Sequence, residues 1–171
     1  MKLSDHFSSS EFRCHGPECQ TVEPIVDPEL VENLEKWRAL LNASIQPGQP
    51  EHKLIVNSGC RCAVWNSHEG GKPGSSHLYD PLTGQAGKAA DCYSPTRSVR
   101  EVYQAALKVA AFKGIGLAPP VPPDPAKGIK GRVGYVHVDV RGTATRAQWG
   151  YDDRGIVVAL TSVLPKLGIE V

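Results

Sequence analysis

Residues 135–140 read Tyr-Val-His-Val-Asp-Val, which is a strong β-strand pattern. Side chains alternate between the two faces of a strand, so His137 and Asp139 share one face and the three valines share the other. The valine face predicts contact with a hydrophobic core. The polar face would carry a desolvation penalty unless its groups are satisfied, and a bound metal ion would satisfy them. The alternative explanation is an exposed polar face on an edge strand.

The rest of the chain predicts two amphipathic helices and several strands. Apolar residues recur at helical spacing over 27–43 and 98–113, and a capping box of Ser98 and Glu101 marks the start of the second helix. Helices and strands that do not alternate regularly predict an α+β domain with a small, mainly antiparallel sheet flanked by helices. The expected strands are 53–58, 115–117 and 135–140, and 156–164 fits either a strand or a terminal helix.

Length and composition predict a single domain over residues 1–171, with 1–26 as an N-terminal docking arm anchored by Phe7 and Phe12. The formal net charge of +1 gives no electrostatic reason to expect nucleic acid or an anionic membrane as partner. No apolar run approaches the roughly 20 residues that cross a bilayer, so no membrane insertion is expected. The polar start of the chain is unlike a secretory signal, which predicts synthesis in the cytoplasm and another exit route for any work outside. We expect a monomer.

Five cysteines are an odd number, so at least one cannot pair within a monomer. Neither the Cys14–Cys19 spacing nor the Cys60–Cys62 spacing is the CxxC pattern of a structural zinc ribbon. Buried reduced thiols are the favoured interpretation. A disulfide between the loop of Cys14 and residues 60–62, or a second metal site, are the alternatives.

Two further segments offer metal ligands to join His137. His77 ends the run Pro-Gly-Ser-Ser-His in a glycine-rich loop, and Asp91 ends Gly-Lys-Ala-Ala-Asp. Two imidazoles and one carboxylate would hold one zinc ion and leave a fourth position for water, as a catalytic zinc requires. Asp80, three residues after His77, competes with Asp91 for the carboxylate role.

A metal-activated water also needs a general base and a positive group for the developing negative charge. Asp139 is the candidate base because it lies beside His137 on the strand, although it could instead orient that ligand. Arg61 is the candidate anion-binding and catalytic residue, since its planar guanidinium suits a carboxylate. His68 and Glu69 are weaker alternatives for acid or base.

Together these segments resemble the zinc D-Ala-D-Ala carboxypeptidase family, whose relatives include bacterial murein endopeptidases, phage L-alanyl-D-glutamate endolysins and the metal-binding Hedgehog domain. The resemblance extends from residue 3 to about residue 149. It is carried by an ordered set of motifs: Leu3-Ser4-Asp5-His6-Phe7, Ser10-Glu11-Phe12, Ser58-Gly59-Cys60-Arg61 with Asn66, Gly70-Gly71, Ser75-x-His77, Gly87-x-Ala89-x-Asp91 and His137-Val138-Asp139.

The resemblance implies a Hedgehog-like or DD-peptidase-like zinc domain in which His77, Asp91 and His137 bind one Zn²⁺. It implies that Arg61 contacts the substrate or its oxyanion and that Ser75 supports the substrate site. The implied activity is hydrolysis of peptide bonds to D-amino acids in peptidoglycan stem or cross-link peptides, as carboxypeptidase or endopeptidase. A phage or prophage endolysin that degrades the cell wall after release or export is the expected setting.

Two departures from the family pattern matter. Thirteen residues separate His77 from Asp91, where the family commonly has six, so 78–86 contains an apparent insertion of seven. An inserted loop adds little closure entropy, which keeps Asp91 preferred to Asp80. Several relatives carry their catalytic acid three positions before the last histidine, where this chain has Gly134. That change favours a rival hypothesis, a catalytically silent metal-binding module for cell-wall or protein ligands; a cysteine-based redox protein is the weaker third reading.

Overall fold

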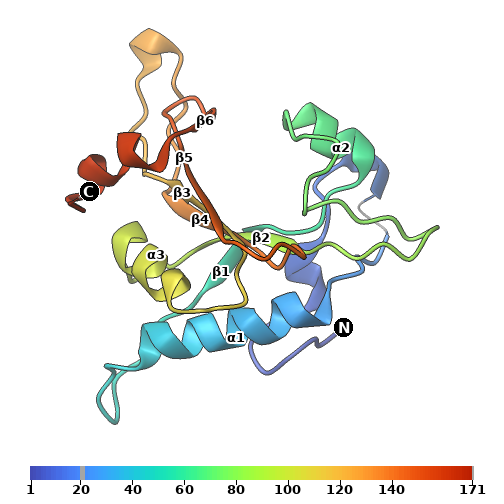
Figure 1. The fold of residues 1–171 in the computed structure, drawn as a ribbon, viewed down its shortest axis with the longest axis horizontal. Coiled ribbons are helices and arrows are strands. Elements are labelled where there is room, and N and C mark those ends of the chain that lie inside the picture. The colour runs from blue at the N-terminus through green and yellow to red at the C-terminus, as the bar shows by residue number, and fades with distance from the viewer. Residues whose placement is uncertain (20–21, 171) are drawn as a thin grey trace.

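The computed structural model describes residues 1–19 and 22–170, and its centre is one six-stranded sheet in the order β1-β2-β4-β3-β5-β6 (Figure 1). Every neighbouring pair is antiparallel except β3 and β5. This arrangement confirms the predicted α+β class with a mainly antiparallel sheet. The strands are β1 (Ile55–Ser58), β2 (Ala89–Tyr93), β3 (Gly114–Ala118), β4 (Tyr135–Asp139), β5 (Ala147–Tyr151) and β6 (Val157–Val158).

Two of the helices cover one face of this sheet, as Figure 1 shows. The indole of Trp37, on α1 (Pro28–Asn42), donates to the carbonyl of Val102, on α3 (Val99–Leu107), over 2.9 Å and packs edge-on against Phe112. The short helix α2 (Ala63–His68) lies away from α1 and α3, beside the N-terminal segment (Figure 1). The helices are α1 (Pro28–Asn42), α2 (Ala63–His68) and α3 (Val99–Leu107), with 3₁₀ turns at Ser9–Phe12, Pro17–Cys19, Pro125–Lys127, Leu160–Ser162 and Leu164–Leu167.

The valine face of β4 lies in the core, as the alternation predicted. Val136 and Val138 are fully buried, and the aromatic anchors of the N-terminal arm, Phe7 and Phe12, belong to the same hydrophobic cluster. Burying such side chains contributes about 1.5–3 kcal/mol each. The opposite face of the sheet is therefore the one that carries the polar side chains.

The sequence expectations missed the strands β2 and β5 and the helix α2, and the expected elements differ most from the structure in two places. The helix predicted over 98–113 is α3, which ends at Leu107. The backbone carbonyls of Leu107, Val109 and Phe112 accept hydrogen bonds from the guanidinium of Arg146 instead of from a continuing helix. The 156–164 segment is a two-residue strand followed by a 3₁₀ turn rather than one continuous element. Among the described residues, no helix is long and apolar enough to span a bilayer.

Candidate metal centre

Three polar side chains converge on the open face of the sheet. Asp91 on β2 and His137 on β4 are direct partners in the antiparallel ladder, and His77 reaches them from the loop before β2. All three are buried. His137 Nδ1 lies 2.8 Å from Asp91 Oδ1 and 3.1 Å from His77 Nε2, and the third side of the triangle, from His77 Nε2 to Asp91 Oδ1, is 3.4 Å.

These spacings fit a tetrahedral zinc ion. Zinc–nitrogen and zinc–oxygen bonds of about 2.0–2.2 Å put neighbouring tetrahedral ligand atoms roughly 3.3–3.6 Å apart. The triangle of His77, Asp91 and His137 needs only small adjustments to reach that size. A fourth position remains beyond the plane of the three ligand atoms.

Hydrogen bonds to the other ring nitrogens fix what the two histidines present to this triangle. His77 Nδ1 lies 2.6 Å from the carbonyl oxygen of Gly59, which can only accept, so that nitrogen carries the proton. His137 Nε2 lies 3.1 Å from the carboxylate of Asp139 and donates to it in the same way. In the neutral rings the remaining nitrogens, His77 Nε2 and His137 Nδ1, each carry a lone pair and no proton. Both face Oδ1 of Asp91. Three acceptors this close require a cation or an added proton between them.

The pKa shifts describe the metal-free site. Burial raises the pKa of Asp91, but His77 and His137 outweigh it and hold that pKa well below its usual range. Burial lowers the pKa of His77. Burial acts in the same direction on His137, but Asp139 and Asp91 outweigh it and raise the pKa overall. These shifts favour His137 over His77 as the site of the added proton when no metal is bound, and a divalent cation would replace that proton.

Asp139 lies behind His137 rather than beside the open position. Its side chain is fully buried, and it accepts hydrogen bonds from Arg141, from Nε over 2.7 Å and from Nη2. The resulting chain of Arg141, Asp139 and His137 is the arrangement that orients a ligating histidine. These contacts favour the orienting role for Asp139, and its role as general base stays a prediction.

Arg61 contacts the carboxylate ligand directly. Its Nη2 donates to Asp91 Oδ2 over 2.8 Å, and Nε and Nη2 donate to the hydroxyl of Ser58. Asp91 therefore turns Oδ2 to Arg61 and Oδ1 to the two histidines. Arg61 Nη1 takes no part in these bonds. Ser75, the other predicted substrate-site residue, accepts a hydrogen bond from the backbone N–H of His77 over 3.3 Å and so supports the ligand loop.

The inserted segment 78–86 forms a small hairpin outside the site. Asp80 pairs with Gln85 across it, and the carboxylate of Asp80 accepts from the backbone N–H of Leu82 over 2.9 Å. The hairpin returns the chain to β2, which brings Asp91 to the two histidines. The structure thus places Asp91, and not Asp80, in the cluster.

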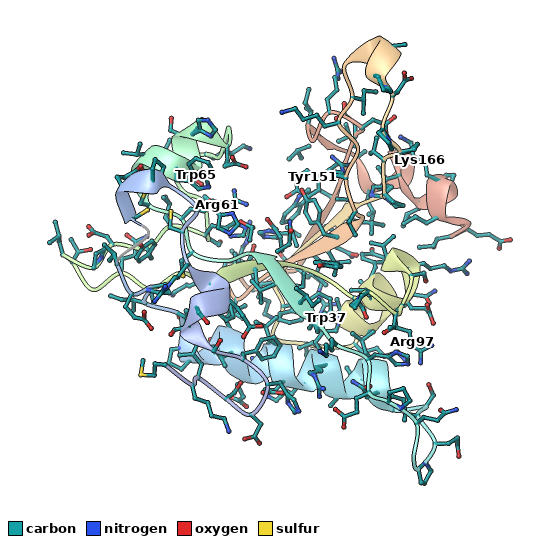
Figure 2. All side chains as sticks on the ribbon, turned by 180° about the vertical axis from the view of Figure 1, so that it is seen from behind. Trp37, Arg61, Trp65, Arg97, Tyr151 and Lys166 are labelled. Atoms are coloured by element: carbon teal, nitrogen blue, oxygen red, sulfur yellow. The ribbon has the colours of Figure 1, made fainter. Side chains whose placement is uncertain are left out.

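Aromatic side chains that sequence reasoning missed lie next to the cluster on the same face. The indole of Trp149 is 5.1 Å from the ring of His137, and Tyr151 stands between Trp149 and Tyr135. Figure 2 shows Tyr151 on one side of this face and Arg61 with Trp65 on the other. Alternation along 147–151 would have placed Trp149 and Tyr151 on one face, but five residues with a glycine were too short a signal.

Two glycines of β3 make this packing feasible. A Cβ on Gly116 would lie 2.6 Å from the indole nitrogen of Trp149, and one on Gly114 would lie 2.2 Å from the carboxylate of Asp139. Both distances are far below van der Waals contact. On the face that carries His137, β3 therefore presents only backbone at these two positions. The side chains of Asp139 on β4 and Trp149 on β5 fill the space.

The remaining acid–base candidates lie elsewhere. Gly134 has no room for the acid that several relatives carry, because a Cβ there would lie 2.8 Å from the ring of Pro120 and 2.9 Å from its backbone nitrogen. His68 and Glu69 are exposed at the end of α2 and contact each other over 3.3 Å.

A family sequence model described as Peptidase M15 matches residues 5–139. The chain belongs to this family. The match confirms the resemblance to the zinc D-Ala-D-Ala carboxypeptidases, and it covers every residue predicted for the site. Comparisons with curated proteins and with solved structures gave no match. Arg141, Trp149 and Tyr151 lie beyond the matched residues, so this structure alone connects them with the site.

Proposed function

We propose that this M15 peptidase is a zinc enzyme that hydrolyses peptide bonds to D-amino acids in peptidoglycan. The family establishes a metallopeptidase, and the buried cluster of His77, Asp91 and His137 is the observation that carries the proposal. Its ligand atoms are spaced for zinc, and its neutral histidines present unprotonated nitrogens to the same point. We assign these three residues as the zinc ligands.

When bound, zinc supplies a Lewis acid and lowers the pKa of a water ligand to about 7. The chain's own residues hold that centre in shape. Gly59 and Asp139 fix the ring orientations of the two histidines, and Arg61 fixes Asp91. Each of these contacts removes a rotation that would misplace a ligand atom.

Substrate binding is assigned to groups around the open face. Nη1 of Arg61 is available to a substrate carboxylate or a developing oxyanion, because Nε and Nη2 are engaged by Ser58 and Asp91. Half-buried Trp149 and Tyr151 offer an apolar surface for a small side chain such as the methyl group of alanine. Burial raises the pKa of Tyr135 to about 12, with Asp91 adding to the shift, so its phenol stays protonated at neutral pH and can donate a hydrogen bond.

The test is incubation of purified peptidoglycan with zinc-loaded protein, followed by mass spectrometry of the soluble products. Release of D-alanine identifies a carboxypeptidase, and release of cross-linked or stem peptides identifies an endopeptidase. Chelator-treated protein and His77→Ala should both release neither product. Zinc-loaded protein without product from any peptidoglycan would reject the proposal. Because the substrate is the cell wall, we also propose that the protein acts there after release or export, as an endolysin does.

One observation favours a second candidate, a metal-binding module without catalysis. Gly134 stands where several relatives carry an acid, a Cβ there would lie 2.8 Å from the ring of Pro120, and Asp139 is buried behind His137. Such a module would bind zinc and sediment with insoluble peptidoglycan but release nothing. Product release in the experiment above would exclude it.

A further inference from the structure

A second cluster of metal-binding side chains lies away from the histidines, where the N-terminal segment meets α2. The sulfur atoms of Cys14, Cys19 and Cys62 lie within 4.8 Å of one another, and all three cysteines are free thiols. Cys14 and Cys19 are buried and Cys62 is half-buried. In Figure 2 sulfur atoms gather beside Trp65 and Arg61. Residues 48 positions apart in the chain thus bring three soft ligands to one point.

Backbone N–H groups point at two of these sulfurs. The N–H of Cys62 donates to Cys14 Sγ over 3.3 Å, and the N–H of Trp65 donates to Cys62 Sγ over 3.3 Å. A neutral thiol is a weak acceptor, whereas a thiolate held by a metal is a strong one. The backbone is thus arranged to support negative charge on sulfur.

A carboxylate lies next to one of the three sulfurs, although it is not within 4.8 Å of all three. Glu18 Oε1 lies 3.3 Å from Cys62 Sγ, and Glu18 is the residue before Cys19. Gly16 makes this approach feasible, because a Cβ there would lie 2.9 Å from Glu18 Oε1 and 3.1 Å from Cys19 Sγ. The loop between the first two cysteines therefore folds around the sulfurs and the carboxylate with no space for a side chain.

An unpartnered hydroxyl gives an independent indication. The Tyr79 side chain is only 3% exposed, and its OH has no hydrogen-bond partner among the described residues. Burial raises the pKa of Tyr79, and Cys19 and Cys14 are the neighbours that raise it further, so the phenol adjoins these sulfurs. A thiolate at Cys19 would give this buried O–H donor a strong acceptor.

We propose that Cys14, Cys19 and Cys62 form a structural zinc site separate from the proposed catalytic centre, and that Glu18, the carboxylate next to Cys62, moves in to complete it. Three thiolates and one carboxylate are a closed tetrahedral donor set, and soft sulfur ligands favour zinc over magnesium or calcium. Zinc–sulfur bonds of about 2.3 Å put tetrahedral sulfurs roughly 3.8 Å apart. The three sulfurs lie within 4.8 Å of one another, so they need only approach slightly to bind one ion. Binding releases the three thiol protons to solvent.

The site would tie the N-terminal segment to the residue next to Arg61. Cys62 is the N-cap of α2, and the N–H of Arg61 donates to the carbonyl of His77. An ion at Cys62 therefore fixes the backbone that carries the Asp91-binding guanidinium and borders a catalytic ligand.

The experiment measures zinc per chain in purified protein by mass spectrometry of the metal. Wild type should hold two ions, and Cys19→Ala and His77→Ala should each hold one. Cys92→Ala is the matched control, because it removes a buried thiol outside the cluster and should retain both. Cobalt substitution is the second readout. The one ion left in His77→Ala should show the sulfur-to-cobalt charge-transfer absorption, and the one left in Cys19→Ala should lack it.

Two outcomes would overturn the proposal. One is a single ion in wild type that Cys19→Ala retains and whose cobalt form lacks the sulfur band. The other is a disulfide, seen when alkylation of the denatured, chelated protein labels fewer than the five cysteines. Cobalt spectra of wild type and His77→Ala decide the question even if Cys19→Ala does not fold. Failure of peptidoglycan hydrolysis would leave this site unaffected, so the two proposals are tested separately.

Discussion

The two ligand clusters of this protein are built in opposite ways. The histidine–aspartate cluster takes two of its three ligands from adjacent strands, and side chains and carbonyls hold each ligand from behind. The cysteine cluster takes its ligands from a loop and a helix N-cap, and backbone N–H groups hold the sulfurs. Among the described residues, the first brings together three ligand atoms beside half-buried aromatic rings, whereas the second brings together three sulfurs with the carboxylate of Glu18 next to one of them. This contrast is the one that our two proposals require, a reactive centre and a structural one.

Loss of a proposed zinc ligand should have the largest effect. His77→Ala removes one corner of the triangle, so activity on peptidoglycan should fall to that of chelator-treated protein. Its thermal midpoint should change little, because the sheet and the cysteine cluster remain. The control is His52→Ala, which removes an exposed imidazole that hydrogen-bonds to Thr96 and is not part of the cluster. It should keep full activity. Activity retained in His77→Ala would break the assignment of the first cluster.

Asp139→Asn sharpens the description of the reactive centre. An orienting residue behind a ligand should, when changed, reduce metal affinity or activity by about 10–100-fold. We therefore expect weaker zinc binding in chelator competition together with slower hydrolysis. Hydrolysis abolished at unchanged zinc affinity would instead support the role of general base that the sequence suggested.

Cys19→Ala should show the reverse pattern from His77→Ala. Loss of a structural ion removes a link between the N-terminal segment and α2, so the protein should unfold at lower temperature. A loss of about 2 kcal/mol corresponds to roughly 4–8 °C for a chain of this size. Differential scanning calorimetry with and without added zinc measures it. A midpoint equal to that of Cys92→Ala would contradict the difference between the clusters.

Gly116→Ala tests how the sheet shapes the aromatic surface. The added methyl group would meet the indole of Trp149 at 2.6 Å, so the indole must move away from His137. Overpacking of this kind costs about 1–3 kcal/mol, and tryptophan fluorescence should report the displacement. Gly142→Ala is the matched control, since a Cβ there meets nothing within 4 Å. Equal stability and spectra in the two variants would show that Trp149 is not held by this contact.

Acid should weaken the metal-free protein through Asp139. Burial raises the pKa of this carboxyl, but His137 and Arg141 outweigh it and hold the pKa far below the unfolded value of about 3.9. Its contribution to stability is complete above that unfolded value and is lost as pH falls toward the folded one. Denaturant unfolding of chelated protein from about pH 6 to pH 3 should show this fall in the free energy of unfolding. In Asp139→Asn the free energy of unfolding should depend less steeply on pH. Parallel slopes would contradict it.

The sequence predicted the parts of the site that follow from local periodicity and motif spacing. Alternation placed His137 and Asp139 on one face of β4 and the valines in the core, and motif order singled out Asp91 after a long insertion. The same alternation places Arg141 on the face of His137 and Asp139, so this partner of Asp139 could have been predicted from the sequence. Trp149 could not, because its position depends on β5 pairing with a glycine-containing strand.

The cysteine cluster shows the same limit. Its spacing within the sequence matches no familiar motif, and only the docking of the N-terminal segment on α2 brings Cys14 and Cys19 to Cys62. Long-range docking is set by the sum of core contacts, such as those of Phe7 and Phe12, and short patterns do not encode it.

The hairpin 78–86 makes this scaffold permissive to grafting. Its base is closed by the pairing of Asp80 with Gln85, and its tip residue Leu82 is 95% exposed. Extra sequence inserted at Leu82 would extend away from that closed base while His77 and Asp91 keep their places on either side. A fluorescent label or a targeting peptide can thus be installed between two proposed ligands of the same centre.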